Sequence, residues 1–156
     1  MFRALFIHWV RPVLAPTVFS LDARPPDTSL ISMMMPFAPQ FDSVVERVRR
    51  LSTELGMRCE RADDIWEHDM VIQDVVNLIA RSAVVICDCS GRNPNVFYET
   101  GIAHSIGKRV ILIAQNSDDI PFDLRHLRFL TYLSNGEGLE QLAAGLKERI
   151  QTLTRT

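Results

Sequence analysis

The sequence has few cysteines, no long apolar run and no marked excess of one charge. Three cysteines among 156 residues are too few for a disulfide framework and indicate a reducing compartment. No apolar stretch approaches the roughly 18 residues that a membrane-spanning helix needs. Seventeen basic and 19 acidic residues leave a formal net charge of −2, which argues against duplex DNA or an anionic membrane as partner. We therefore expect a cytoplasmic globular protein with neither partner.

The amino-terminal residues 1–28 have no regular pattern. Residues 2–7 and 17–21 are each compatible with a short strand, and four prolines in the segment exclude a long helix. The start of the chain faintly resembles a secretion signal, but a histidine and an arginine interrupt it and no cleavage site follows. An extra hairpin, an oligomerisation arm and a loosely docked leader all stay open. We treat residues 1–28 as an extension of uncertain structure and residues 29–156 as the domain.

From residue 29 onward, apolar runs and amphipathic segments alternate. Continuous apolar runs predict buried strands, and apolar residues at helical spacing predict helices. Strands are expected at 30–35, 57–61, 84–87, 110–114 and 129–133, and helices at 41–55, 71–79, 95–106 and 139–150. This alternation predicts a small doubly wound α/β domain, Rossmann-like or flavodoxin-like, with a parallel sheet covered by helices on both faces. Ligands of such sheets bind at the carboxyl ends of the strands, here in the loops 36–40, 88–95 and 115–128.

The loop after the third predicted strand carries the most chemistry. Asp88 ends the strand, and Asn93 or Asn95 is placed to cap the next helix. Backbone amides at that helix start, with Arg92 beside them, predict an anion site. Glu99 lies within about the first turn, where the helix dipole is expected to lower its pKa and to suit attack on a sugar carbon. Acidic residues at such places also serve as caps and ion-pair partners, and the residues alone leave that alternative open.

These residues resemble the nucleoside 2-deoxyribosyltransferase-like superfamily. The specific part is the run Gly-Arg-Asn-Pro-Asn-Val-Phe-Tyr-Glu at 91–99, followed by Thr-Gly-Ile-Ala-His. The resemblance also includes segments 35–37, 61–64, 83–88 and 120–128, and it covers about residues 29–133. The superfamily includes transferases that exchange bases on deoxyribonucleosides and N-glycosidases that hydrolyse nucleoside monophosphates. A related Toll/interleukin-receptor-type fold uses a helix glutamate to cleave NAD.

The resemblance implies roles for particular residues. Glu99 would be the nucleophile that attacks C1′ of the sugar, and Asp74 would assist the leaving base. Asp88 would bind sugar or base, or orient Glu99. The implied substrate-binding residues are Met35, Pro36, Phe37, Ser90, Gly91, Arg92, Asn93, Asn95 and Tyr98. The resemblance implies no metal or organic cofactor and a homodimer or larger homo-oligomer, with a nucleoside, nucleotide or NAD as ligand.

Two alternatives follow from departures from the family pattern. Val96, Phe97 and Tyr98 are bulky where well-studied catalytic members have small residues. If Phe97 or Tyr98 fills the space for C1′, the domain would bind a nucleotide without turning it over and act as a sensor or interaction module. A third interpretation, NAD hydrolysis, keeps Glu99 but requires a pocket that holds a dinucleotide.

Other chemistries find little support in the sequence. Cys87 and Cys89 lack a second cysteine pair and make a poor zinc signature, so we expect buried, inert thiols. Phosphate-binding P-loop, dinucleotide-binding and serine-hydrolase glycine motifs do not occur. Arg125, His126 and Arg128 lie near the expected ligand edge. We prefer a solvated charge cluster or a subunit contact for these three over phosphate binding, because exposed charges usually contribute little.

Overall fold

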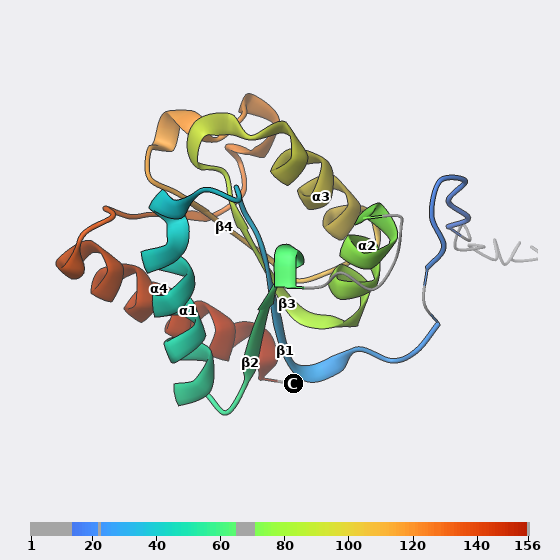
Figure 1. Cartoon of the computed structure of the whole chain (residues 1–156), viewed down its shortest axis with the longest axis horizontal. Coiled ribbons are helices and arrows are strands. Elements are labelled where there is room, and N and C mark those ends of the chain that lie inside the picture. Colours follow the sequence, from blue (N-terminus) through green and yellow to red (C-terminus); the bar gives the residue numbers. More distant parts are fainter. Residues whose placement is uncertain (1–13, 22, 65–70, 156) are drawn as a thin grey trace, which may run out of the picture.

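A computed structural model describes residues 14–21, 23–64 and 71–155 (Figure 1). Strands and helices alternate along these residues, as the apolar pattern predicts. In chain order the elements are β1 (Asp27–Met34), α1 (Asp42–Glu54), β2 (Arg58–Arg61), α2 (Val71–Arg81), β3 (Ser82–Asp88), α3 (Pro94–Ser105), β4 (Val110–Ala114), β5 (Phe129–Thr131) and α4 (Gly136–Thr154). Within the described ranges, no helix is both long and apolar enough to span a membrane.

The five strands form one parallel sheet in the order β2-β1-β3-β4-β5. This flavodoxin-like order confirms the predicted doubly wound fold. The chain winds outward from β1 to β2, then crosses back to β3 and continues to β5. The order therefore reverses between β1 and β3, whose pairing aligns Met33 with Ile86 and Met34 with Cys87.

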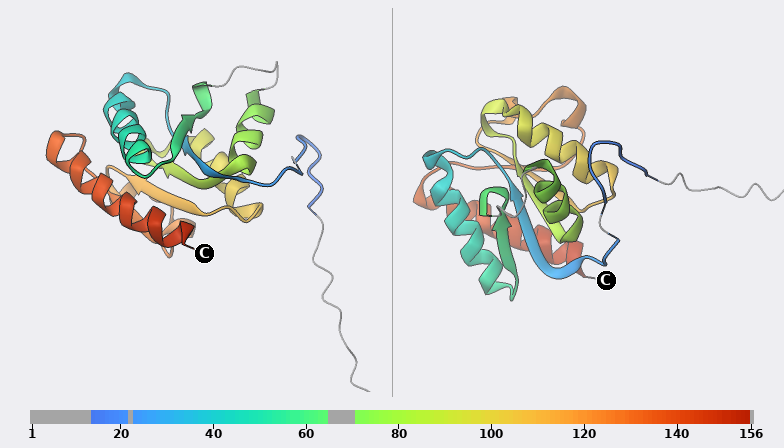
Figure 2. Two further views of the ribbon diagram at one scale, coloured as in Figure 1. Left: turned by 90° about the horizontal axis from the view of Figure 1, so that it is seen from below. Right: turned by 45° about the vertical axis from the view of Figure 1, so that its right-hand side comes forward.

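Helices α1 and α4 cover one face of the sheet, and α2 and α3 cover the other (Figure 2). Successive strand residues point to opposite faces, so a strand buried on both sides must be apolar throughout. In β1, Ile31 and Met33 pack toward α1 and α4, whereas Leu30 and Met34 pack toward α2 and α3. This explains the nearly continuous apolar run at 30–35, in which only Ser32 is polar. Cys87 and Cys89 are buried free thiols, as expected.

An ion pair connects the two helices on the first face. The guanidinium of Arg47 in α1 donates to both carboxylate oxygens of Glu140 in α4, at 2.7 and 3.0 Å. The Arg47 side chain is nearly buried, whereas Glu140 keeps contact with water. Helix α1 ends at Glu54, and Gly56 just beyond it has a φ of +70°, a conformation that glycine adopts without strain.

The described part of the amino-terminal extension lies along α2 and α3. The Ser20 amide donates to the Gln73 side chain at 2.9 Å, and that side chain donates back to the Ser20 carbonyl at 2.9 Å. Phe19 and Leu21 pack against the core under α2 and α3. Residues 17–21 form bends and irregular structure, so the strand considered there is wrong. The strand considered at 2–7 lies outside the described residues.

Candidate functional site

A pocket opens at the carboxyl ends of β1 and β3, where the strand order reverses. Its volume is about 350 Å³, near the lower end of the roughly 300–1,000 Å³ of small-molecule sites. Two of the three loops expected at the ligand edge contribute to it, and the loop 115–128 does not. The wall consists of Met35, Pro36, Phe37, Ala62, Asp63, Ile72, Asp74, Val75, Asn93, Asn95, Val96, Tyr98 and Glu99.

Glu99 is a partly buried carboxyl group in this wall. Pro94 begins α3, so Glu99 is the sixth helical residue and lies in the second turn. Burial raises its pKa from the ordinary value of 4.5 to about 7. The expected first-turn position and lowered pKa are therefore wrong. The helix dipole acts mainly within the first turn, and beyond it the loss of hydration decides the pKa.

Asp74 brings a second carboxyl group to the same pocket. It lies in the first turn of α2, a helix on the same face of the sheet as α3, and its exposed fraction is only 5%. The sequence places Asp74 and Glu99 25 residues apart, and the fold sets them in one wall because both helices start at the carboxyl edge of the sheet. Two carboxyl groups in one small pocket are the arrangement that glycosidic-bond chemistry uses.

Asp88 has a different environment, although it also lies at the end of β3. It is fully buried and does not belong to the pocket wall. One carboxylate oxygen accepts from the Ser90 amide at 3.0 Å and the Ser90 hydroxyl at 2.6 Å, and the other accepts from the Tyr132 hydroxyl at 2.5 Å. Burial raises the pKa of Asp88, and these hydrogen bonds oppose that increase. Asp88 thus fixes the loop that follows β3.

Polar groups of the loop from Ser90 to Asn93 form hydrogen bonds with neighbouring parts of the protein. Gly91 and Arg92 both have positive φ, 72° and 54°, which turns the chain sharply before α3. The Gly91 amide donates to the Asp119 carboxylate at 2.9 Å, and the Arg92 guanidinium donates to the carbonyl of residue 118 at 2.5 Å. Ser90, Gly91 and Arg92 are outside the pocket wall. Asn93 caps α3 by accepting from the Asn95 amide at 2.9 Å, as predicted.

Aromatic side chains flank the pocket. Phe37 is 60% exposed and Tyr98 53% exposed, although both belong to its wall. The guanidinium carbon of Arg61 lies 5.7 Å from the centre of the Phe37 ring, within range of a cation–π contact. Arg61 also forms an ion pair with Asp63. An exposed aromatic pair beside a small pocket is suited to hold a flat, apolar ligand group.

Sequence reasoning missed part of the wall. Asp63 was included in the resemblance but received no role, and the apolar residues Ala62, Ile72, Val75 and Val96 received none. The spacing of Ile72, Val75 and Val96 indicates only that they face inward on a helix. Which inward residues border a pocket depends on where helices diverge at the sheet edge, and a single sequence carries no signal for that.

A scan of the chain against models of known protein families and a search of curated proteins both found no match. Within the described residues, no group of three or more His, Cys, Asp or Glu side chains is arranged to hold a metal ion. The functional interpretation therefore depends on the geometry and chemistry of the pocket.

Proposed function

We propose that this protein cleaves or transfers the N-glycosidic bond of a nucleoside, with Glu99 as the nucleophile. One observation carries the proposal: Glu99 and Asp74 share the wall of a pocket of about 350 Å³. Glu99 has no hydrogen-bond or ion-pair partner among the described residues, so its carboxylate is available to a substrate. The resemblance of segment 91–99 to the nucleoside 2-deoxyribosyltransferase-like superfamily independently points to the same residue.

The reaction proceeds in two displacements. The Glu99 carboxylate attacks C1′ of the sugar while the bond from C1′ to the base nitrogen breaks, and the base leaves with that electron pair. Asp74, in the same wall, assists the departing base. Water or a second base then attacks C1′ and releases Glu99. Because the nucleophile must be ionised and its pKa is about 7, the rate should rise with pH through neutrality.

The charge of the pocket favours an uncharged nucleoside over a nucleotide. Among the described residues, its wall contains three carboxyl groups and no Lys, Arg or His. Arg61 pairs with one of them, Asp63, and the ionised carboxylate of Glu99 would oppose a phosphate. Arg92, the residue expected to hold phosphate, hydrogen-bonds to the loop 115–128 instead.

The size and shape of the pocket bear on the two alternatives. A volume of about 350 Å³ suits one nucleoside better than a dinucleotide, which gives little support to NAD hydrolysis. Phe97 lines a different groove, which α3 forms with the amino-terminal residues Leu14, Pro16 and Phe19. Of Phe97 and Tyr98, only Tyr98 lies in the pocket wall. The alternative of a domain that binds a nucleotide without turning it over therefore depends on Tyr98 alone.

Product analysis by liquid chromatography tests the proposal. The purified protein is incubated with a panel of nucleosides, nucleoside 5′-monophosphates and NAD at several pH values. We expect free base from at least one nucleoside, with a loss of at least about 100-fold for Glu99→Gln and a comparable loss for Asp74→Asn. Glu46→Gln removes an exposed carboxylate from α1 and should retain full activity.

Three results would contradict parts of the proposal. Equal activity of the Glu99→Gln variant would remove Glu99 as the nucleophile. Faster cleavage of monophosphates than of nucleosides would overturn the argument from pocket charge. No product from any substrate, with a nucleoside still raising the melting temperature, would establish a binding module in place of an enzyme.

A further inference from the structure

A second cavity lies between the edge strand β5 and helix α4, well apart from the site described above. Its volume is about 500 Å³, and it shares no wall residue with the candidate active site. Its wall contains residues just before and within β5 and residues from the second half of α4. It therefore lies toward the amino ends of the strands, whereas the candidate active site lies at their carboxyl ends.

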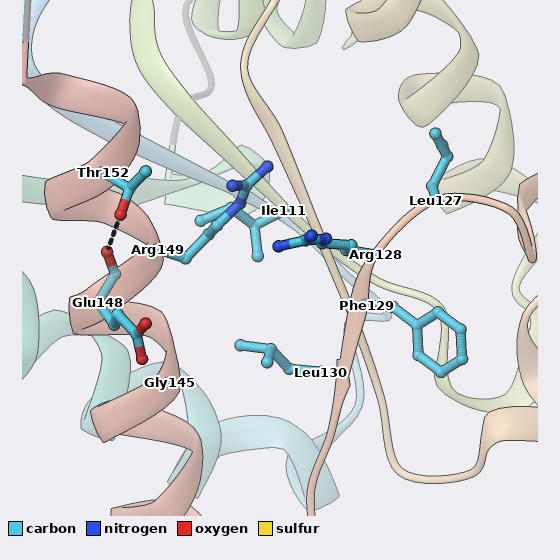
Figure 3. A pocket seen from close by; sticks show the side chains of 9 residues that line it. All are labelled: Ile111, Leu127, Arg128, Phe129, Leu130, Gly145, Glu148, Arg149 and Thr152. Atoms are coloured by element: carbon cyan, nitrogen blue, oxygen red, sulfur yellow. Dashed lines mark hydrogen bonds between the residues drawn. The ribbon is translucent and has the colours of Figure 1, made fainter.

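The lining of this cavity combines apolar side chains with two arginines and one glutamate. Ile111 is buried, and Leu130 packs beneath the helix at Gly145. A Cβ atom at Gly145 would lie 3.3 Å from a methyl carbon of Leu130, so any larger side chain there would intrude on the space. In Figure 3 the side chains of Arg128 and Arg149 extend from opposite sides into the space between strand and helix.

Neither arginine is paired with a carboxylate among the described residues. Within the described part of the chain, Arg128 and Arg149 have no ion-pair or hydrogen-bond partner. Glu148 also belongs to the wall but forms no ion pair with either of them. Two like charges facing one space repel each other, and an anion between them would relieve that repulsion. Guanidinium groups bind carboxylates and phosphates through paired N–H donors.

We propose that this cavity, named the β5–α4 cavity, binds a small anionic molecule whose apolar body rests on Ile111 and Leu130 and whose carboxylate or phosphate binds Arg128 and Arg149. The volume is that of a drug-sized ligand, and an apolar wall with a few convergent charged groups is typical of such sites. Binding here is independent of the nucleoside chemistry proposed for Glu99. This proposal gives Arg128 a ligand, whereas the sequence alone favours a solvated charge or a subunit contact for it.

Isothermal titration calorimetry with 2-naphthoate tests this assignment. We expect saturable binding that weakens at least tenfold in the double variant Arg128→Gln/Arg149→Gln and weakens as salt is added. Lys147→Gln removes an exposed cation from the same helix outside the cavity wall and should bind as the wild type does. The Glu99→Gln variant should also bind normally, which separates this site from the candidate active site.

Matched probes separate the contributions of charge and apolar body. The neutral 2-naphthamide and inorganic phosphate should each bind at least tenfold more weakly than 2-naphthoate. Comparison of 2-naphthoate with 2-naphthyl phosphate shows which anionic group the arginines prefer. Circular dichroism checks that the double variant folds, and the two single variants replace it if it does not.

Several results would overturn the assignment. They are no binding of either anionic probe to the wild type, unchanged binding to the arginine variants, or equal binding of 2-naphthamide. Size-exclusion chromatography provides a further check. A change of oligomeric state in the arginine variants would show that this face is a subunit contact and would also overturn it.

Discussion

Replacing Glu99 with glutamine should make the protein more stable, but only when the solution is not acidic. Burial raises the pKa of Glu99 from 4.5 to about 7, so the folded protein favours the protonated form more than the unfolded chain does. The associated stability is fully present below pH 4.5 and is lost as the pH rises through 7. Glutamine stays neutral throughout and avoids this loss.

The size of the effect follows from the same shift. One pKa unit corresponds to about 1.4 kcal/mol, so a change from 4.5 to about 7 sets an upper limit of about 3–4 kcal/mol. Glu99 keeps partial contact with water, and we therefore expect about 2 kcal/mol. For a domain of this length, that raises the melting temperature of the variant by roughly 4–8 °C at pH 8. At pH 4 the two proteins should melt within about 1 °C of each other.

Thermal unfolding followed by circular dichroism from pH 4 to pH 8 measures this difference directly. Glu46→Gln removes an exposed carboxylate from α1 and controls for the change in net charge. A difference between the Glu99 variant and the wild type that stays constant across this range would refute the reasoning. Greater stability of the wild type at pH 8 would do so more strongly, because it would mean that the ionised carboxylate has a stabilising partner.

Substitutions at three further positions test individual hydrogen bonds and packing contacts of the fold. Tyr132→Phe removes the hydroxyl that donates to buried Asp88 and should lower the free energy of unfolding by about 1–3 kcal/mol, measured by urea denaturation. Gly138→Ala would place a Cβ atom 2.3 Å from the Leu133 carbonyl oxygen and should cost about 1–3 kcal/mol, whereas a neutral result would show that the start of α4 shifts easily. Asn135→Ala removes the cap of α4 and should cost about 1 kcal/mol, and Asn135→Asp should restore it.

The sheet and its helices could be predicted because strands buried on both faces are made of successive apolar residues, a pattern that is easily recognised in the sequence. Strands β1, β3 and β4 each contain a largely apolar run, and each lies between two neighbouring strands. Edge strands have a weaker apolar pattern and are harder to predict. Strand β5 is only three residues long and ends two residues before the predicted boundary at 133. The segment 17–21 has a strand-like composition, but only Phe19 and Leu21 pack on the core and the backbone bends.

The site was predicted less completely, because its properties depend on which groups each side chain faces, and residue type alone does not determine that. Asp88 accepts a hydrogen bond from Tyr132, 44 residues further along the chain, and no local sequence pattern predicts that contact. The Arg92 side chain donates to the carbonyl of residue 118, which lies 26 positions away in the sequence. Asn93, by contrast, caps α3 through a contact two residues away, which local sequence can predict.

The contrast between Asp88 and Glu99 argues for which carboxyl group is free to react. Burial raises the pKa of both groups, and they lie only 11 positions apart in the chain. Asp88 accepts three hydrogen bonds from the protein, is fully buried and does not border the pocket, so a ligand in the pocket does not reach it. Glu99 has lost hydration without gaining a partner among the described residues. Leaving a buried carboxylate without a hydrogen bond costs free energy, and such unfavourable arrangements are common at functional sites. A substrate that supplied the missing partner would bind where the protein is least satisfied.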